Sequence, residues 1–225
     1  PQAALVCAHH VTAEIVRSFE GAAGLRNVLS DKRINSIVIG PGLGRGEGAR
    51  SLVATVLASE ASVVLDADAL SSFEGQADTL FGLIRAKPGA AVVMTPHDGE
   101  FERLFPGLRK RAVNKIEAAR MAAELSGAVV VLKGPDTVIA HLQGLARVNT
   151  MAPPWLATAG SGDVLAGLVA GLLAQGVPGL DAACLAVETH SLAGAVAGRG
   201  LIATDLLDAI AEIRKNPGLV ADIAL

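Results

Sequence analysis

The chain has 225 residues, enough for one substantial domain, and its composition excludes several classes of protein. Hydrophobic residues make up 51% and the mean hydropathy is +0.47, but only 3% are aromatic, which favours stacked helices and buried parallel strands. A net charge of −3 argues against nucleic acid or an anionic membrane as a partner, and two cysteines are too few for a disulfide framework.

No run of apolar residues reaches the length that a transmembrane helix needs. The nearest, Ala182–Gly198, contains Glu188 and His190. The beginning of the sequence also lacks the pattern of a secretory signal peptide. These features predict a cytoplasmic enzyme with a small-molecule substrate.

Short apolar runs alternate with helical patterns as far as residue 132. The runs that we expect to form buried strands are Ala4–Ala8, Ser36–Ile39, Ser62–Leu65, Ala91–Met94 and Ala128–Leu132. The helical patterns lie at Thr12–Phe19, Gly46–Ser59, Gly99–Phe105 and Val113–Leu125. This alternation is typical of an α/β fold with a mostly parallel sheet.

The remaining third is predicted to begin with a hairpin and to continue as helices. Thr137–His141 and Ala146–Asn149 flank Leu-Gln-Gly and are expected to pair at the edge of the sheet. Helices are expected at 163–175, 179–197 and 204–214. We find no internal repeat, low-complexity tract or linker, so a single domain is expected.

Ligands of such sheets bind beyond the carboxyl ends of the strands, so the residues after each strand are candidates for a site. The first such segment is Gly40-Pro41-Gly42-Leu43-Gly44, where glycines allow a ligand to approach the backbone closely. The spacing is not G-x-G-x-x-G, and the chain has no Walker A motif. Alone, this loop is equally typical of a tight turn.

Charged side chains follow the later strands. Asp66 and Asp68 are candidates for binding Mg²⁺ or orienting a polar substrate, or else a loop acid and a helix cap. His97 and Glu100 lie in a turn, where Glu100 is equally well explained as a first-turn helix acid. Lys133 precedes a Gly-Pro turn and is either a phosphate ligand or a solvated lysine.

The most informative segment is Thr158–Gly167, which joins a small-residue turn, an acid and an apolar helix. Gly160 and Gly162 let consecutive N–H groups point at one anion at the beginning of a helix. A carboxylate beside bound phosphate is electrostatically unfavourable, which favours a catalytic role for Asp163. A helix cap is the alternative for this residue.

Other polar residues are interpreted as structural. His190 and Glu188 are expected to form a buried polar pair that fixes helix packing, and Arg109–Arg111 a solvated surface turn. The chain lacks G-x-S-x-G and H-E-x-x-H motifs, and neither cysteine has a polar neighbour suited to activate it. Serine hydrolase, zinc hydrolase and thiol chemistry are therefore excluded.

In chain order, the strand-end motifs resemble those of the ADP/ATP-dependent NAD(P)H-hydrate dehydratases, a branch of the ribokinase-like superfamily. The matching segments are Gly40–Gly44, Asp66–Leu70, Thr95–Glu100, Leu132–Thr137 and Gly160–Gly167. The resemblance covers nearly the whole chain and implies a three-layer α/β/α sandwich with a mostly parallel central sheet. It also implies the substrate, the S epimer of hydrated NADH or NADPH, from which water is removed at the expense of ADP or ATP.

The family's implied route is phosphoryl transfer to the ring hydroxyl and then elimination of phosphate, a better leaving group than hydroxide. The resemblance makes Asp163 the general base. It assigns nucleotide binding to Lys133, Gly134, Pro135, Asp136, Thr137, Gly160, Ser161 and Gly162. It assigns substrate binding to Gly42, Gly44, His97, Glu100 and Asp163. Mg²⁺ is expected on the nucleotide phosphates, and no nucleic acid or membrane is expected as a partner.

The chain departs from the family pattern in several places. Asp98 stands for the second proline of T-P-H-P-G-E, and Ser161 for the threonine of G-T-G-D. In the less typical segment Asn149–Leu156, Trp155 is a candidate for stacking on adenine or for covering the edge of the sheet. We expect residues 1–225 to form a single ribokinase-like dehydratase domain that lacks the family's first strand and helix.

The family resemblance further implies a homo-oligomer, with a tetramer favoured, and an NAD(P)H-hydrate epimerase as a fused domain or partner. Two other functions remain open. One is a vitamin-precursor kinase of the same superfamily, acting on a hydroxymethylpyrimidine, a hydroxyethylthiazole or pyridoxal, because such kinases share the G-x-G-D turn. The other is a catalytically silent nucleotide-binding module.

Overall fold

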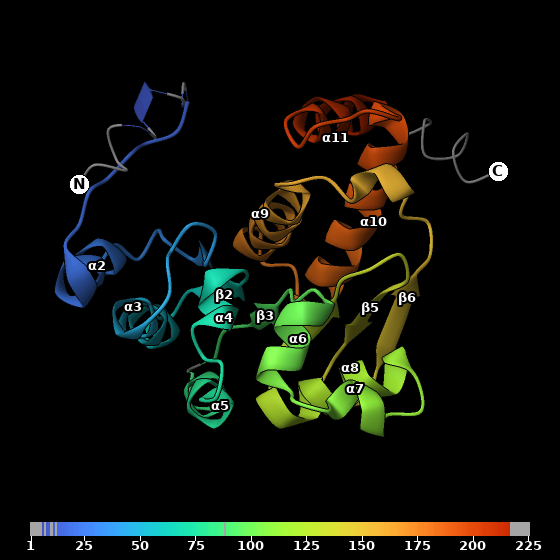
Figure 1. Cartoon of the computed structure of the whole chain (residues 1–225). Coiled ribbons are helices and arrows are strands. Elements are labelled where there is room, and N and C mark those ends of the chain that lie inside the picture. The colour runs from blue at the N-terminus through green and yellow to red at the C-terminus, as the bar shows by residue number, and fades with distance from the viewer. Residues whose placement is uncertain (1–5, 7, 10, 12, 88, 217–225) are drawn as a thin grey trace.

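The structure, a computed structural model, describes residues 6, 8, 9, 11, 13–87 and 89–216, and a six-stranded sheet lies at its centre (Figure 1). The strands are β1 (Ser36–Ile39), β2 (Ser62–Leu65), β3 (Val92–Met94), β4 (Val129–Leu132), β5 (Thr137–Ala140) and β6 (Ala146–Asn149). They lie side by side in chain order. Strands β1 to β4 are parallel, whereas β5 and β6 are antiparallel to their neighbours, so the predicted sheet and hairpin are confirmed.

Helices cover both faces of this sheet. Those that precede or connect the parallel strands are α2 (Gly21–Leu29), α3 (Glu47–Leu57), α4 (Asp68–Ser71), α5 (Ala77–Arg85), α6 (Asp98–Leu104), α7 (Leu108–Arg111) and α8 (Lys115–Ser126). Those that follow the hairpin are the 3₁₀-helix η1 (Pro154–Leu156), α9 (Ser161–Ala174), α10 (Gly179–Ala197) and α11 (Asp205–Lys215).

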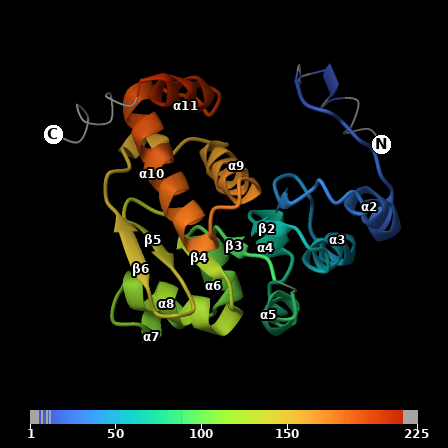
Figure 2. The same ribbon diagram turned by 180° about the vertical axis from the view of Figure 1, so that it is seen from behind.

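The helices sort into two layers because the parallel strands follow one another across the sheet, and right-handed crossovers then fall on one face. Helices α3, α5, α6 and α8 contribute to one hydrophobic core, and α9 and α10 to the other. Strand β2 shows the division, since Val63 and Leu65 belong to the first core and Val64 to the second. Figure 2 shows α10 crossing the second face. The expected three-layer α/β/α sandwich is therefore confirmed.

The predictions fail near the beginning of the chain. Most of the expected strand Ala4–Ala8 lies outside the described residues, and its two described residues, Val6 and Ala8, are helical rather than extended. The expected helix Thr12–Phe19 is wrong, because residues 13–20 are not helical and the first described long helix begins at Gly21. Ile15 and Phe19 have helical spacing, but they are 82% and 42% exposed, and a short helix without a surface to pack against is marginal.

The helices differ from the predictions in two further places. Arg109–Arg111, expected to be a solvated surface turn, forms the last turn of the short helix α7, where Lys110 and Arg111 are exposed. Helices α2 and α5 were not expected from the sequence.

Within the part of the chain that the structure describes, none of the helices combines the length and the apolar character that crossing a membrane requires.

Candidate active site

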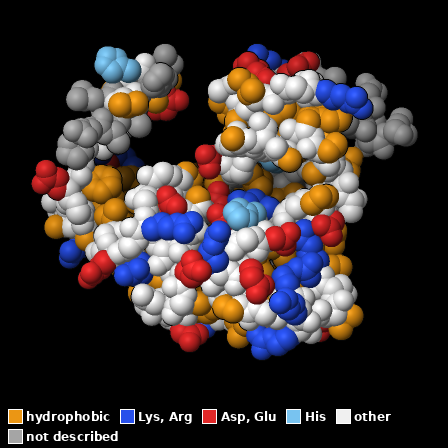
Figure 3. Space-filling view, viewed as in Figure 1, with side chains coloured by type: hydrophobic (Ala, Val, Ile, Leu, Met, Phe, Trp, Pro, Cys, Tyr) orange, Lys and Arg blue, Asp and Glu red, His pale blue; other side chains and the backbone are white. Residues whose placement is uncertain are grey.

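The candidate residues converge because parallel strands end at one edge of the sheet. The segments after β1, β2, β3 and β4 therefore lie beside one another. Helix α9, from the opposite layer, packs against β1 and β2, which brings its first residues to the same edge. Figure 3 shows acidic, basic and histidine side chains gathered in the middle of this face, where the surface is hollowed below α9.

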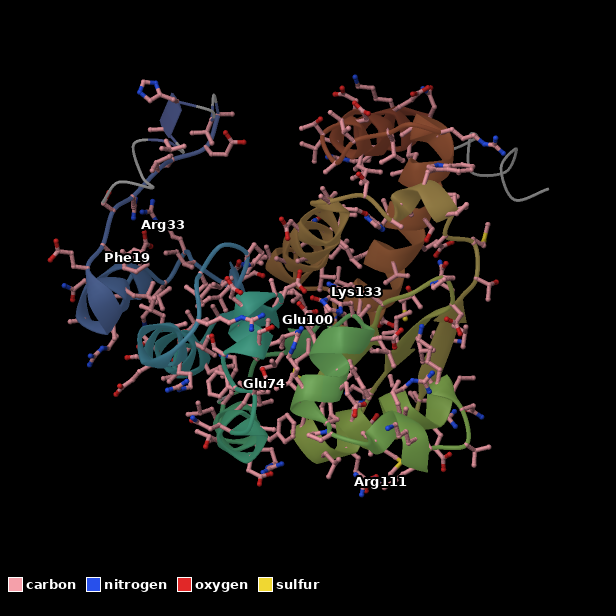
Figure 4. The ribbon with its side chains drawn as sticks, viewed as in Figure 1. Phe19, Arg33, Glu74, Glu100, Arg111 and Lys133 are labelled. Atoms are coloured by element: carbon pink, nitrogen blue, oxygen red, sulfur yellow. The ribbon has the colours of Figure 1, made fainter. Side chains whose placement is uncertain are left out.

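Lys133 lies at the centre of this group. Its Nζ is 2.9 Å from Asp66 Oδ1 and 4.0 Å from Glu100 Oε2. Figure 4 shows Lys133 and Glu100 together, between α6 and α9. Asp66 is only 2% exposed, so this carboxylate depends on Lys133 for its charge balance. The backbone N–H of Lys133 donates to the Pro96 carbonyl at 2.9 Å, which ties the ends of β3 and β4 together.

The glycine turn at the beginning of α9 lies close to this ion pair. A Cβ added to Gly162 would lie 3.3 Å from Lys133 Nζ and 4.0 Å from Asp66 Oδ2. Gly160 has a φ of +82°, a left-handed conformation that suits glycine. No described residue accepts a hydrogen bond from the N–H of Gly160 or Gly162. These two N–H groups are thus free to bind an anion beside an ammonium group.

Asp163 follows this turn and remains partly exposed. Burial raises the pKa of its carboxyl group, and the nearby Asp66 carboxylate raises it further, while Lys133 acts in the opposite direction. A raised pKa suits a carboxylate that must accept a proton. Asp163 also borders a groove of about 900 Å³ that runs along α9 towards α11.

The segment Lys133–Thr137 forms a closed loop. Thr137 Oγ1 donates to the Gly134 carbonyl at 2.9 Å and accepts from its N–H at 3.2 Å. Lys115, on α8, contacts the loop at two points: its Nζ is 2.8 Å from Asp136 Oδ1 and 3.4 Å from the Lys133 carbonyl oxygen. The Lys115 ammonium group lowers the pKa of Asp136. The loop is therefore ordered by the protein itself.

His97 and Glu100 cap α6 as a reciprocal pair. His97 Nδ1 accepts hydrogen bonds from the N–H groups of Gly99 and Glu100, while Glu100 Oε2 accepts one from the His97 N–H at 2.9 Å. Since Nδ1 is an acceptor, a neutral His97 ring carries its proton on Nε2. The His97 side chain is 55% exposed, so this ring has a fixed orientation and an accessible edge. Both residues thus have a structural role at the beginning of α6.

The glycine-rich loop after β1 packs tightly at one end and is open at the other. Gly40 has a φ of +136°, and an added Cβ would overlap the carbonyl oxygen of Asp66. Gly42 and Gly44, in contrast, have open space around the Cβ position. The Gly44 N–H donates to Asp68 Oδ2 at 2.9 Å, so Asp68 holds this loop in place.

The two aspartates considered for metal binding therefore have other partners in the chain. Among the described residues, no group of three or more His, Cys, Asp or Glu side chains could hold a metal ion. Trp155, a candidate for adenine stacking, donates from Nε1 to the Gly194 carbonyl at 2.6 Å, and Arg199 lies over its ring at 5.9 Å. Its ring thus packs against α10.

One contact at the site was not anticipated from the sequence. His190 is 9% exposed, and its Nε2 lies 3.0 Å from Ser161 Oγ and 2.9 Å from the Ser161 carbonyl oxygen. Glu188 is exposed, so the expected buried pair of His190 and Glu188 is wrong. The available signal was the one imidazole of a mainly apolar helix.

Comparisons with known proteins agree with this geometry. The model of a family described as NAD(P)H-hydrate dehydratase matches residues 2–216. The chain is 41% identical to a bifunctional NAD(P)H-hydrate repair enzyme of Salinibacter ruber over 188 residues, which is 80% of this chain and 33% of the relative. It is 38% identical to an ADP-dependent (S)-NAD(P)H-hydrate dehydratase of Neisseria meningitidis, over 81% of this chain and 64% of the relative.

Solved structures show the same likeness. An ADP/ATP-dependent NAD(P)H-hydrate dehydratase from Bacillus subtilis, co-crystallised with ATP and Mg²⁺, is 30% identical with a TM-score of 0.69, over 86% of this chain and 69% of that one. A hydroxyethylthiazole kinase from Pyrococcus horikoshii shares the fold, with a TM-score of 0.64 at 18% identity. The chain spans about a third of the length of the bifunctional relatives that it matches.

Proposed function

This chain belongs to the NAD(P)H-hydrate dehydratase family, and we propose that it removes water from the S epimer of hydrated NADH or NADPH while consuming ADP or ATP. The observation that carries the proposal is the closeness of Lys133 to Gly162, whose Cβ position lies 3.3 Å from Lys133 Nζ. An ammonium group and free backbone N–H groups therefore lie near Asp163, a carboxylate with a raised pKa. That is the arrangement needed to move a phosphoryl group onto a hydroxyl.

In the first step, Asp163 accepts the proton of the ring hydroxyl. The hydroxyl oxygen forms a bond to the terminal phosphorus of the nucleotide, and the bond from that phosphorus to the departing nucleotide breaks. Charge on the transferring group is stabilised by Lys133 and by the N–H groups of Gly160 and Gly162. In the second step the carbon–oxygen bond breaks, phosphate leaves with the electron pair, and the neighbouring ring carbon loses a proton to restore the double bond.

The loop Lys133–Thr137 is the proposed nucleotide site, together with Gly160–Gly162. Support comes from the loop's preorganised backbone and from Lys133, whose Nζ lies 3.3 Å from the Cβ position of Gly162. Mg²⁺ would neutralise charge on the nucleotide phosphates. Mg²⁺ usually takes only one or two carboxylates and otherwise phosphate and water, which is compatible with a site where Asp66 and Asp68 have protein partners.

Gly42, Gly44, His97 and Glu100 are proposed to contact the hydrated dinucleotide. The open space at the two glycines permits a ligand to approach the backbone, and the fixed His97 ring offers an N–H donor. Glu100 would act mainly through His97, whose backbone N–H it binds.

We infer the wider context from the same family membership. Residues 1–225 are proposed to act as one catalytic domain in the cytoplasm and to assemble as a homo-oligomer, with a tetramer favoured. Because the proposed activity uses only the S epimer, an epimerase, fused or separate, would be needed to repair the R epimer as well.

The proposal is tested by adding the protein to hydrated NADH with Mg²⁺ and either ADP or ATP, and following the return of the NADH absorbance. We expect return with at least one nucleotide, and none with Asp163→Asn, which should still bind nucleotide. Asp181→Asn is the matched control, because Asp181 is an exposed acid in the first turn of α10.

Full activity of Asp163→Asn would show that Asp163 is not the base. Nucleotide consumption with a hydroxymethylpyrimidine, a hydroxyethylthiazole or pyridoxal, but not with hydrated NADH, would instead favour the kinase. Nucleotide binding without turnover of any of these would favour the silent binding module.

A further inference from the structure

The buried imidazole of His190 contacts Ser161, within the glycine turn at the beginning of α9. His190 lies on α10 and Ser161 is the first residue of α9, so the contact joins the two helices of one layer. His190 Nε2 is within hydrogen-bond distance of both the carbonyl oxygen and the hydroxyl oxygen of Ser161. Ser161 is itself only 4% exposed.

The geometry determines which ring nitrogen carries the proton. A carbonyl oxygen can only accept a hydrogen bond, so Nε2 of His190 must be the donor to Ser161. Burial lowers the pKa of His190, so the ring is neutral at physiological pH and Nδ1 is unprotonated. The Ser161 hydroxyl oxygen is then a second acceptor for the same N–H.

The consequence for the site follows from peptide geometry. The Ser161 carbonyl and the Gly162 N–H belong to one planar trans peptide unit and point in opposite directions. A donor that holds the carbonyl therefore also fixes the direction of the Gly162 N–H. That N–H has no acceptor among the described residues, and the Cβ position of Gly162 lies 3.3 Å from Lys133 Nζ.

We propose that His190 is a positioning residue that, through the Ser161 carbonyl, holds the Gly162 N–H towards the phosphoryl group. This inference rests on the proposed function for its ligand, a nucleotide phosphate. The tautomer of His190 and the direction of the peptide unit do not depend on the proposed function. His190 touches no reacting atom.

The first test is the tautomer, which needs no activity. In ¹⁵N NMR spectra of the labelled chain at neutral pH, the two ring nitrogens of His190 should show the pattern of an Nε2–H tautomer. An Nδ1–H tautomer or a charged ring would overturn the proposal, because neither is a neutral ring that donates from Nε2 alone.

The second test follows the Gly162 amide resonance as ADP and Mg²⁺ are added. We expect a clear shift in the wild type that is largely lost in His190→Leu and retained in His190→Gln, whose side-chain amide can still donate. Glu188→Gln, at an exposed position of the same helix, is the control and should behave as the wild type. The same shift in His190→Leu as in the wild type would overturn the proposal.

Turnover gives a third readout if the dehydratase reaction is confirmed. His190→Leu should lower kcat at least about tenfold with little change in the KM for the hydrated dinucleotide, since a misdirected N–H weakens mainly the transition state. His190→Gln should recover most of kcat. An unchanged kcat in His190→Leu would contradict the inference, whereas a wild type without turnover would count against the proposed function alone. If His190→Leu fails to fold, the His190 tautomer in the wild type and the Gly162 amide shift in His190→Gln still test the inference. Loss of that shift in a folded His190→Gln would overturn the inference.

Discussion

At the scale of single residues, the charge on Asp163 is unfavourable for folding. Its folded-state pKa is raised by burial and by Asp66, so the folded chain binds the Asp163 proton more tightly than the unfolded chain does. Above its unfolded pKa near 3.8, ionised Asp163 therefore lowers the free energy of unfolding, and this loss develops as pH rises through the folded pKa. Such opposition between stability and function is common at catalytic sites.

We therefore predict that Asp163→Asn unfolds at a higher temperature than the wild type at neutral pH. The gain should disappear below pH 3.8, where the wild-type carboxyl is protonated in both states. Thermal unfolding at several pH values measures this, with Asp181→Asn as the control. A less stable Asp163→Asn at neutral pH would refute the explanation.

Lys133 has the opposite effect on stability. If Lys133→Met removes its ammonium group, the carboxylate of Asp66 stays buried at 2% exposure without its ion-pair partner. Breaking a buried pair in this way typically costs about 3–5 kcal/mol. We predict a loss of this size in urea unfolding.

The double variant Asp66→Leu/Lys133→Met should recover part of that loss, because the Asp66 carboxylate is removed together with its partner, whereas Glu100 still loses its ion pair with Lys133. Equal stability of the single and double variants would mean that the cost comes from lost packing of the lysine rather than from the unpaired carboxylate.

At the scale of elements, two glycines of the loop between β1 and α3 differ in the space around their Cβ positions. Gly40 and Gly42 both have positive φ, but only at Gly40 would a Cβ meet backbone, at the Asp66 carbonyl. We predict that Gly40→Ala destabilises the chain by at least about 3 kcal/mol, since strain and overlap add. Gly42→Ala should cost only about 1–2 kcal/mol, the strain alone. Similar unfolding free energies for the two variants would contradict the close approach.

The loop after β4 depends on α8 through Lys115. Lys115→Met should release Asp136 and the Lys133 carbonyl and so loosen the proposed nucleotide site. We predict a rise of about tenfold in the KM for the nucleotide, from the loss of charge-assisted hydrogen bonds. Lys115→Arg should restore part of the affinity, and Lys110→Met on α7 should leave it unchanged. An unaltered KM in Lys115→Met would show that the loop holds its shape without α8.

The elements themselves were largely predictable from local patterns. The strands β1 and β2 and the helix α10 have the expected bounds, because β-branched runs and a long apolar helix are unambiguous. The expected burial of β1 is wrong, however, because only Ile39 of this edge strand is buried. The predicted helix Thr12–Phe19 is wrong because helical spacing does not show whether the helix has a surface to pack against. Helix α5 was missed between two strands that the pattern did identify.

At the scale of the whole molecule, the site is made by contacts that no local pattern contains. Asp66 and Lys133 are 67 positions apart, and Ser161 and His190 are 29 apart. The order of the strand-end motifs predicted that candidate residues would gather at one edge of the sheet. It did not predict that Asp66 would pair with Lys133, which depends on how side chains meet across the ends of β2 and β4. Nor did it predict that His190 would contact Ser161, which depends on how α10 packs against α9.

The central claim is that phosphoryl transfer from the nucleotide makes the ring hydroxyl a leaving group. The most direct measurement is to quantify phosphate and restored NADH together, in one reaction of the protein with (S)-hydrated NADH, Mg²⁺ and ADP or ATP. The account predicts that phosphate and NADH appear in equal amounts with the preferred nucleotide, and that neither appears without it. Restoration of NADH without release of phosphate, or no restoration with either nucleotide, would contradict the account.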